Sequence, residues 1–98
     1  MAIRHDPEDQ ETKALLDLAG DLTGKRVLEI GCGHGRLTWR YAGKAAHVTA
    51  IDPNPDKIKR AIREIPDKLR DKVTFQTVSL EQFVTLDRFD LAILSWSL

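Results

Sequence analysis

The segment that most constrains this chain is a glycine-rich turn placed directly after a short aliphatic run. Residues 26–30 (RVLEI) are mostly aliphatic, and residues 31–35 (GCGHG) follow without a spacer. An aliphatic run of this length that stops at glycines is typical of a buried strand entering a tight turn. Glycine permits backbone conformations that other residues avoid, and it lets a ligand lie directly on the backbone. We therefore expect a strand, a turn and a binding surface here.

Strands and helices are predicted to alternate along the rest of the chain. Helical spacing and capping residues predict helices from Pro7 to near Gly24, from after Gly35 through Ala45, and from Asn54-Pro55 to Pro66, with a short helical turn at 80–84. Apolar runs and period-two alternation predict further strands at 47–51, 73–77 and 89–98.

This alternation predicts the fold class. Strands that alternate with helices of this length form right-handed crossovers, and so a parallel, three-layer α/β sheet. The simplest such fold is Rossmann-like, with about four strands in the order 3-2-1-4. With 98 residues, the chain has the length of a single domain, 1–98.

Charge and composition exclude several classes of partner. Lysine plus arginine and aspartate plus glutamate both number 15, so no net field attracts nucleic acid or an acidic membrane. The most basic stretch, 57–72, is interleaved with acidic residues, which is typical of a solvated helix face. No apolar run approaches the ~20 residues that cross a bilayer. The single cysteine and the polar N-terminus favour the cytoplasm, and the histidines lack metal-ligand spacing, so no metal is expected.

The glycine turn and one carboxylate form the candidate ligand site. In such sheets a ligand lies beyond the carboxyl ends of the strands, where the first turn feeds a helix N-terminus. Backbone N–H groups at Gly31, Gly33 and Gly35 are expected to face an anionic or electron-rich ligand group. Asp52 ends the second strand 21 positions after Gly31, near the offset at which an acidic side chain reaches a ribose. Its carboxylate can accept hydrogen bonds from both ribose hydroxyls.

Two sequence motifs carry a family resemblance. VLEIGCGHG followed by AIDPNP resembles motifs I and II of the class I S-adenosylmethionine-dependent methyltransferases. Two further segments, VTFQTVSLEQF and FDLAILSWSL, are similar to the family's third and fourth strands, so the likeness extends over essentially the whole chain. The resemblance implies S-adenosylmethionine as cofactor and S-adenosylhomocysteine as its product. It also implies a chain truncated relative to the family's full seven-stranded fold.

The resemblance assigns roles to individual residues. Glu29 would lie below the methionine moiety of the ligand, reached directly or through water, and Asp52 would hold the ribose hydroxyls. Ser79 stands where the family often has an aspartate that binds the adenine amino group, which is a departure from the pattern. The resemblance implies further contacts from the glycine-turn residues Gly31, Cys32, Gly33 and Gly35, from Pro53 and Leu80 near the adenine, and from Ser95 and Trp96 facing the sulfonium. No residue is assigned a catalytic role.

Alternatives exist for the ligand and for the roles of three residues. A nicotinamide dinucleotide dehydrogenase would need GxGxxG, but Arg36 occupies the sixth position and Glu29 would lie unfavourably near a pyrophosphate. Cys32 lacks a partner that would activate a nucleophile and is expected to be a small loop residue. His34 could be a general base, but in this motif its position commonly points away from the ligand. Trp96 is either a core aromatic or a wall of the pocket.

The last apolar run bears on assembly and function. Residues 89–98 would form an exposed apolar edge strand, which natural proteins avoid because it templates association. We expect a homodimer, or another association, through this strand. The hypotheses for function are a methyltransferase domain acting on a small-molecule acceptor, completed by further strands or a partner, a non-catalytic cofactor-binding half-fold, and a structural relic without a ligand.

Overall fold

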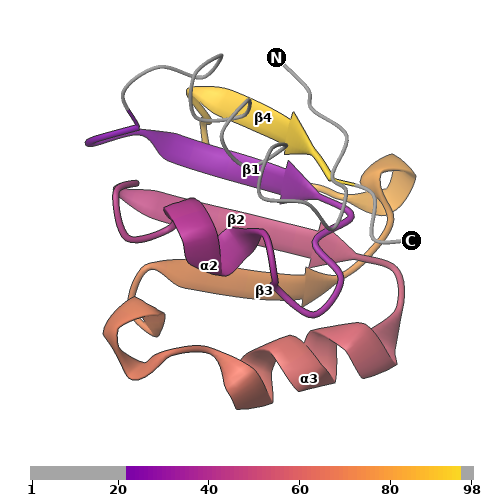
Figure 1. The fold of residues 1–98 in the computed structure, drawn as a ribbon. Coiled ribbons are helices and arrows are strands. Elements are labelled where there is room, and N and C mark those ends of the chain that lie inside the picture. Colours follow the sequence, from indigo (N-terminus) through magenta and orange to yellow (C-terminus); the bar gives the residue numbers. More distant parts are fainter. Residues whose placement is uncertain (1–21, 96–98) are drawn as a thin grey trace.

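The computed structural model describes residues 22–95, in which four parallel strands form one sheet (Figure 1). The strands are β1 (Arg26–Ile30), β2 (His47–Asp52), β3 (Val73–Thr77) and β4 (Leu91–Leu94). The helices are α2 (Thr38–Tyr41) and α3 (Pro55–Glu64), with 3-10 turns η1 (Asp67–Leu69) and η2 (Leu80–Gln82). The order β3-β2-β1-β4 confirms the Rossmann-like topology predicted from the sequence.

The hydrophobic core lies on the sheet face that α2 and α3 cover. The strand register places Leu91, Val27, Val48 and Val73 in one row across this face. The next row, nearer the carboxyl ends, consists of Ile93, Glu29, Ala50 and Phe75. Buried apolar residues from both helices and the loops around them pack on these rows: Leu37, Tyr41, Ala42, Ala45, Ile58, Ile65 and Leu69. One carboxylate therefore interrupts an otherwise apolar face.

Helix α3 forms where local signals predicted it. The Asn54 side chain accepts hydrogen bonds from the backbone N–H groups of Asp56 and Lys57, and Pro55 is the first helical residue. This N-cap satisfies donors that the first helical turn would otherwise leave unpaired. In Figure 1, α3 runs alongside β3, and it buries Ile58 and Ala61.

The helix after the glycine turn is shorter than predicted. It covers four residues, and beyond it Lys44 and Ala45 donate to the carbonyls of Tyr41 and Ala42 in tight three-residue turns. Gly43 lies in this stretch, and glycine favours leaving a helix over extending it. The apolar spacing through Ala45 therefore predicted the buried face correctly and the helix length wrongly.

The remaining predictions concern residues 80–98 and the segment before Gly24. The predicted turn at 80–84 appears as η2, and the last strand begins at Leu91, two residues later than predicted. The predicted helix before Gly24, and Trp96 with the two residues after it, lie outside the described residues. Among residues 22–95, no helix is both long and apolar enough to cross a membrane.

Candidate functional site

The glycine turn closes over the carboxyl ends of β1 and β2. Gly31, Gly33 and Gly35 have φ angles of +79°, +59° and +94°, in the left-handed region that other residues rarely adopt. A Cβ on Gly31 would lie 2.2 Å from the carbonyl oxygen of Ser95, directly after β4. The turn thus depends on glycine both for its conformation and for its close contact with β4.

The N–H groups of the turn are mostly used inside the protein. Gly31 and Cys32 both donate to the Ile51 carbonyl, at 2.8 and 3.1 Å, and Gly35 donates to the Cys32 carbonyl at 3.2 Å. Gly33 donates to Asp52 Oδ2 at 2.9 Å. The N–H groups of Gly31, Gly33 and Gly35, which were expected to face an anionic ligand group, are therefore all hydrogen-bonded within the protein. The short helix α2, which begins only at Thr38, adds little positive dipole.

Asp52 is held in one orientation at the end of β2. It is 7% exposed, and its second oxygen, Oδ1, accepts a hydrogen bond from the Asn54 N–H at 2.8 Å. Each carboxylate oxygen can accept about two hydrogen bonds. The two backbone donors therefore fix the carboxylate and leave one acceptor site on each oxygen, which suits a pair of neighbouring hydroxyls.

Glu29 is a fully buried carboxyl group with one satisfied oxygen. Its Oε1 accepts hydrogen bonds from the Tyr41 hydroxyl at 2.6 Å and the Thr38 hydroxyl at 2.7 Å. Its Oε2 is buried and has no hydrogen-bond partner among residues 22–95. A buried acceptor without a partner costs about 1 to 3 kcal/mol, so Oε2 calls for a donor that the described residues do not supply.

Opposing effects act on the pKa of the Glu29 carboxyl group. Burial raises the pKa of Glu29 above its ordinary 4.5 and the nearby charge of Asp52 raises it further, while the hydroxyls of Tyr41, Thr38 and Ser95 lower it. Ser95 is 1% exposed and close enough to act on Glu29, although it does not complete a hydrogen bond to Oε2. Burial and the neighbouring Glu29 carboxyl raise the pKa of Tyr41, so its hydroxyl remains a donor.

Cys32 has the environment of an unreactive loop residue. It is 4% exposed, and burial, with the nearby Glu29 and Asp52 carboxyls, strongly raises the pKa of its thiol. A thiol kept protonated is a poor nucleophile. The prediction of a small structural residue is thus supported.

The residues expected near the adenine lie at the same edge of the sheet. Pro53 follows β2 and is exposed, while Ser79 is half-buried and Leu80 is 52% exposed just beyond β3. The Val78 N–H donates to the Asp52 carbonyl at 3.1 Å and so ties the two strand ends together. The Ser79 hydroxyl lies 3.4 Å from Gln82 Oε1. The adenine contacts of Pro53, Ser79 and Leu80 stay a prediction, as does the role of Trp96, which lies outside the described residues.

The sequence did not single out Thr38 or Tyr41 as site residues. Tyr41 lies in the hydrophobic core, but its hydroxyl donates a hydrogen bond to Glu29. The signal that could have found the pair is two hydroxyl groups three positions apart on the buried side of a helix that follows a strand containing an acidic residue.

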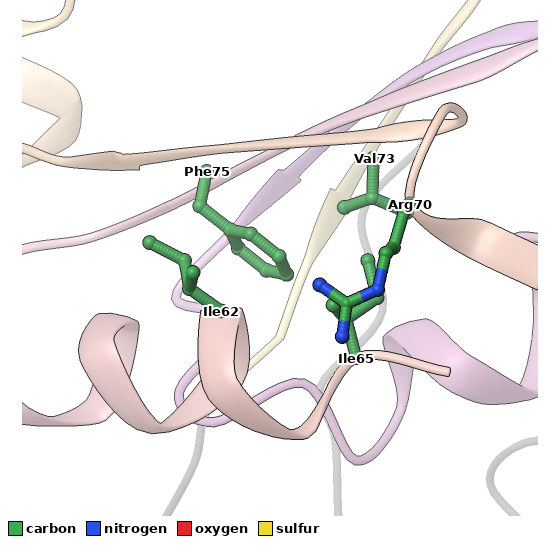
Figure 2. A pocket seen from close by; sticks show the side chains of 5 residues that line it. All are labelled: Ile62, Ile65, Arg70, Val73 and Phe75. Carbon is green, nitrogen blue, oxygen red and sulfur yellow. The ribbon is translucent and has the colours of Figure 1, made fainter. Parts of the chain in front are cut away.

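A separate groove lies between α3 and β3. Figure 2 shows its lining residues, Ile62, Ile65, Arg70, Val73 and Phe75, around a cavity of about 220 Å³. Most of the lining is apolar, and the Arg70 guanidinium is paired with Asp67 at 2.9 Å. None of its lining residues belongs to the glycine turn. In the described part of the chain, no three His, Cys, Asp or Glu side chains gather as metal ligands would.

Comparison with known proteins identifies the family. The profile of the methyltransferase domain family matches residues 27–98. Magnesium-protoporphyrin O-methyltransferase of Rhodobacter capsulatus is 34% identical over 91 residues, which cover 93% of this chain and 40% of that protein. The chain therefore spans less than half the length of this curated relative.

Solved structures agree with the sequence match. The N-methyltransferase NodS of Bradyrhizobium japonicum, in complex with S-adenosylhomocysteine, has a TM-score of 0.74 and 31% identity over 89% of this chain and 44% of that one. Magnesium protoporphyrin IX methyltransferase of Synechocystis, with bound S-adenosylmethionine, has a TM-score of 0.70 and 28% identity over 88% of this chain and 41% of that one. The chain thus belongs to the methyltransferase domain family, among the class I S-adenosylmethionine-dependent methyltransferases, and covers the N-terminal part of their fold.

Proposed function

We propose that this chain binds S-adenosylmethionine and S-adenosylhomocysteine at the glycine turn, and that it serves methyl transfer to a small-molecule acceptor. The observation that carries the proposal is Oε2 of Glu29, which has no partner among residues 22–95 and lies near a turn in which four N–H groups are already bonded. Such a site lacks a donor and carries two carboxyl groups, Glu29 and Asp52. It favours a ligand that brings a positive charge and hydroxyl donors, as this cofactor does.

The residues fit the parts of the cofactor. Glu29 would hold the amino group of its methionine moiety, directly or through water, and Asp52 would hold the ribose hydroxyls. Gly31, Cys32, Gly33 and Gly35 would form the floor, Ser95 and Trp96 would lie towards the sulfonium, and Pro53, Ser79 and Leu80 would contact the adenine. When bound, the cofactor supplies an electrophilic methyl group on a sulfonium. The role of these residues is to bind and orient it, and holding reactants in line can itself lower a barrier by about 7 to 11 kcal/mol.

The same features disfavour a nicotinamide dinucleotide. A pyrophosphate needs free N–H groups and a helix N-terminus. Here four of the five turn amides are engaged, and the buried carboxyl group of Glu29 is close to Cys32 in the turn. We expect NAD⁺ to show no binding in the same titration.

Calorimetric titration with S-adenosylhomocysteine tests the binding. We expect Asp52→Asn to weaken binding by about 1 to 3 kcal/mol, because one acceptor oxygen of the ribose pair is replaced by an amide donor. Asp56→Asn, on the exposed first turn of α3, is the matched control and should bind like the wild type. Unchanged affinity of Asp52→Asn would show that Asp52 does not hold the ribose, and absence of heat with the wild type would overturn the proposal.

Methyl transfer is tested separately from binding. Labelled methyl groups from S-adenosylmethionine should appear in small molecules of a metabolite extract incubated with the chain. The relatives named above are O- and N-methyltransferases, which supports acceptors of these classes. Binding without any labelled product would favour a non-catalytic binding module over an enzyme.

We further propose that the chain acts in the cytoplasm and pairs with a second copy through β4. In the described sheet β4 has one neighbour, β1, and Leu91, Ala92 and Leu94 are half-buried. A strand edge with one neighbour offers unpaired N–H and C=O groups to another strand. Sedimentation that shows a monomer at all concentrations would count against the pairing.

A further inference from the structure

Glu29 lies at a position in the sheet where a carboxyl group does not contribute to apolar packing. It shares its row on the sheet with Ile93, Ala50 and Phe75, all of which are apolar. In the described part of the chain, no cationic side chain is bonded to it. The groups that act on it there are neutral hydroxyls: Thr38 and Tyr41 donate to Oε1, and Ser95 lies close enough to lower its pKa. Burying a carboxyl group without a counter-charge is costly, so the missing positive charge is expected from a ligand.

The two hydroxyl groups act on the same oxygen. Thr38 and Tyr41 lie at the two ends of α2 and both donate to Oε1, at 2.7 and 2.6 Å. Both distances lie at the short end of the range for O–H···O hydrogen bonds. Because Oε1 is occupied twice, the carboxyl plane is fixed and Oε2 is the oxygen that remains.

We propose that Thr38 and Tyr41 are positioning residues for the ammonium group of the ligand. By donating to Oε1 of Glu29, they leave Oε2 of Glu29 as the carboxyl oxygen that accepts a hydrogen bond from that ammonium group. This inference rests on the proposed function and adds to it two residues that do not themselves touch the ligand. It also predicts how selectivity arises. Substitution of Thr38 or Tyr41 should weaken the binding of ligands that carry the amino group and should not weaken the binding of ligands that lack it.

The test compares two ligands by calorimetry on the whole chain. S-adenosylhomocysteine carries the amino group, whereas 5′-methylthioadenosine retains adenine, ribose and sulfur and lacks it. We expect Tyr41→Phe and Thr38→Val each to weaken S-adenosylhomocysteine about tenfold, the scale of one lost charge-assisted hydrogen bond. Both variants should bind 5′-methylthioadenosine within twofold of the wild type.

Two control variants separate positioning from packing. Thr38→Ser keeps the hydroxyl and should restore wild-type affinity for both ligands. Thr49→Val removes a buried threonine hydroxyl from β2, where Thr49 pairs with Leu28 and so faces away from the Glu29 row. It should leave both affinities unchanged.

A pH series gives a second readout. The groups that face Glu29 are Tyr41 and Thr38 from α2, Asp52 from β2, Cys32 from the turn and Ser95 beyond β4. Binding of S-adenosylhomocysteine should weaken on acidification as Glu29 takes up a proton. Since the Tyr41 hydroxyl lowers the pKa of Glu29, Tyr41→Phe should begin to lose affinity at a higher pH than the wild type.

The outcomes are distinguishable. If the variants weaken both ligands equally, or weaken neither, while the wild type binds S-adenosylhomocysteine, the positioning role is overturned and the proposed function stands. If the wild type binds neither ligand, the proposed function fails and the inference fails with it.

Discussion

At the scale of single residues, Glu29 shows a conflict between stability and binding. Its carboxyl group is fully buried, and burial raises its pKa. The folded chain therefore binds this proton more tightly than the unfolded chain does. The resulting stability is complete below the unfolded pKa of about 4.5 and is lost as the pH rises through the higher folded value.

We expect Glu29→Gln to stabilise the chain at pH 8, because the neutral amide avoids the cost of burying a charged carboxylate. Its oxygen can still accept from Thr38 and Tyr41. Urea denaturation at pH 5 and pH 8 checks this, and the wild type should lose more stability than the variant between these values. Burial lowers the pKa of His47, but that group is common to both proteins, so it cancels in the difference. The same variant should bind S-adenosylhomocysteine more weakly, and a less stable variant at pH 8 would contradict the argument.

Two glycines with similar backbone angles allow a matched test of the turn. Gly31 and Gly24 have φ angles of +79° and +75°, but a Cβ at Gly31 would lie 2.2 Å from the Ser95 carbonyl oxygen, whereas one at Gly24 would meet nothing within 4 Å.

We expect Gly24→Ala to cost about 1 to 2 kcal/mol, the strain of a left-handed alanine. Gly31→Ala adds a clash with backbone that cannot rotate away, so it should cost at least ~3 kcal/mol. Denaturant unfolding of the two variants measures the difference. Equal losses of stability in the two variants would show that Gly31, after β1, is not in tight contact with the Ser95 carbonyl, after β4.

At the scale of elements, the sequence predicted what local signals specify. The Asn54-Pro55 start of α3 and the β-strand alternation at 73–77 need only neighbours in sequence, and both appear in the structure. The predicted length of α2 was wrong because a run of apolar residues does not show where tight turns replace helical hydrogen bonds.

The candidate site was predictable only in part. Asp52 and the glycines follow from motif spacing, and the structure joins them through the bond from the Gly33 N–H to Asp52. The contacts of Glu29 with Thr38 and Tyr41 bridge 9 and 12 positions between a strand and a helix. Such pairings depend on how α2 is placed on the sheet, which no local pattern shows.

The N-cap of α3 gives a prediction at this scale. Asn54→Ala removes the acceptor for two N–H groups and should destabilise the chain by about 1 kcal/mol. Asn54→Ser keeps an acceptor oxygen and should be nearly neutral. Thermal and urea unfolding of both variants check this, and a serine variant as unstable as the alanine one would argue against a capping role.

At the scale of the whole molecule, ligand binding should have a large effect on thermal unfolding. A ligand at 100 times its Kd stabilises a folded protein by about 2.7 kcal/mol. In a domain of 60–100 residues, each kcal/mol raises Tm by roughly 4 to 8 °C. We expect saturating S-adenosylhomocysteine to raise Tm by about 10 to 20 °C in differential scanning fluorimetry. An unchanged Tm at saturation would mean that the folded state is not the binding species.

We expect the apolar row that contains Glu29 to differ in relatives that have lost cofactor binding. A leucine or methionine at position 29 would complete the row of Ile93, Ala50 and Phe75 and leave the Thr38 and Tyr41 hydroxyls without an acceptor. In relatives that no longer bind the cofactor, all three residues should therefore change together. An aliphatic residue at position 29 should then occur with valine at position 38 and phenylalanine at position 41. We expect relatives that keep the acid and both hydroxyls to bind the cofactor.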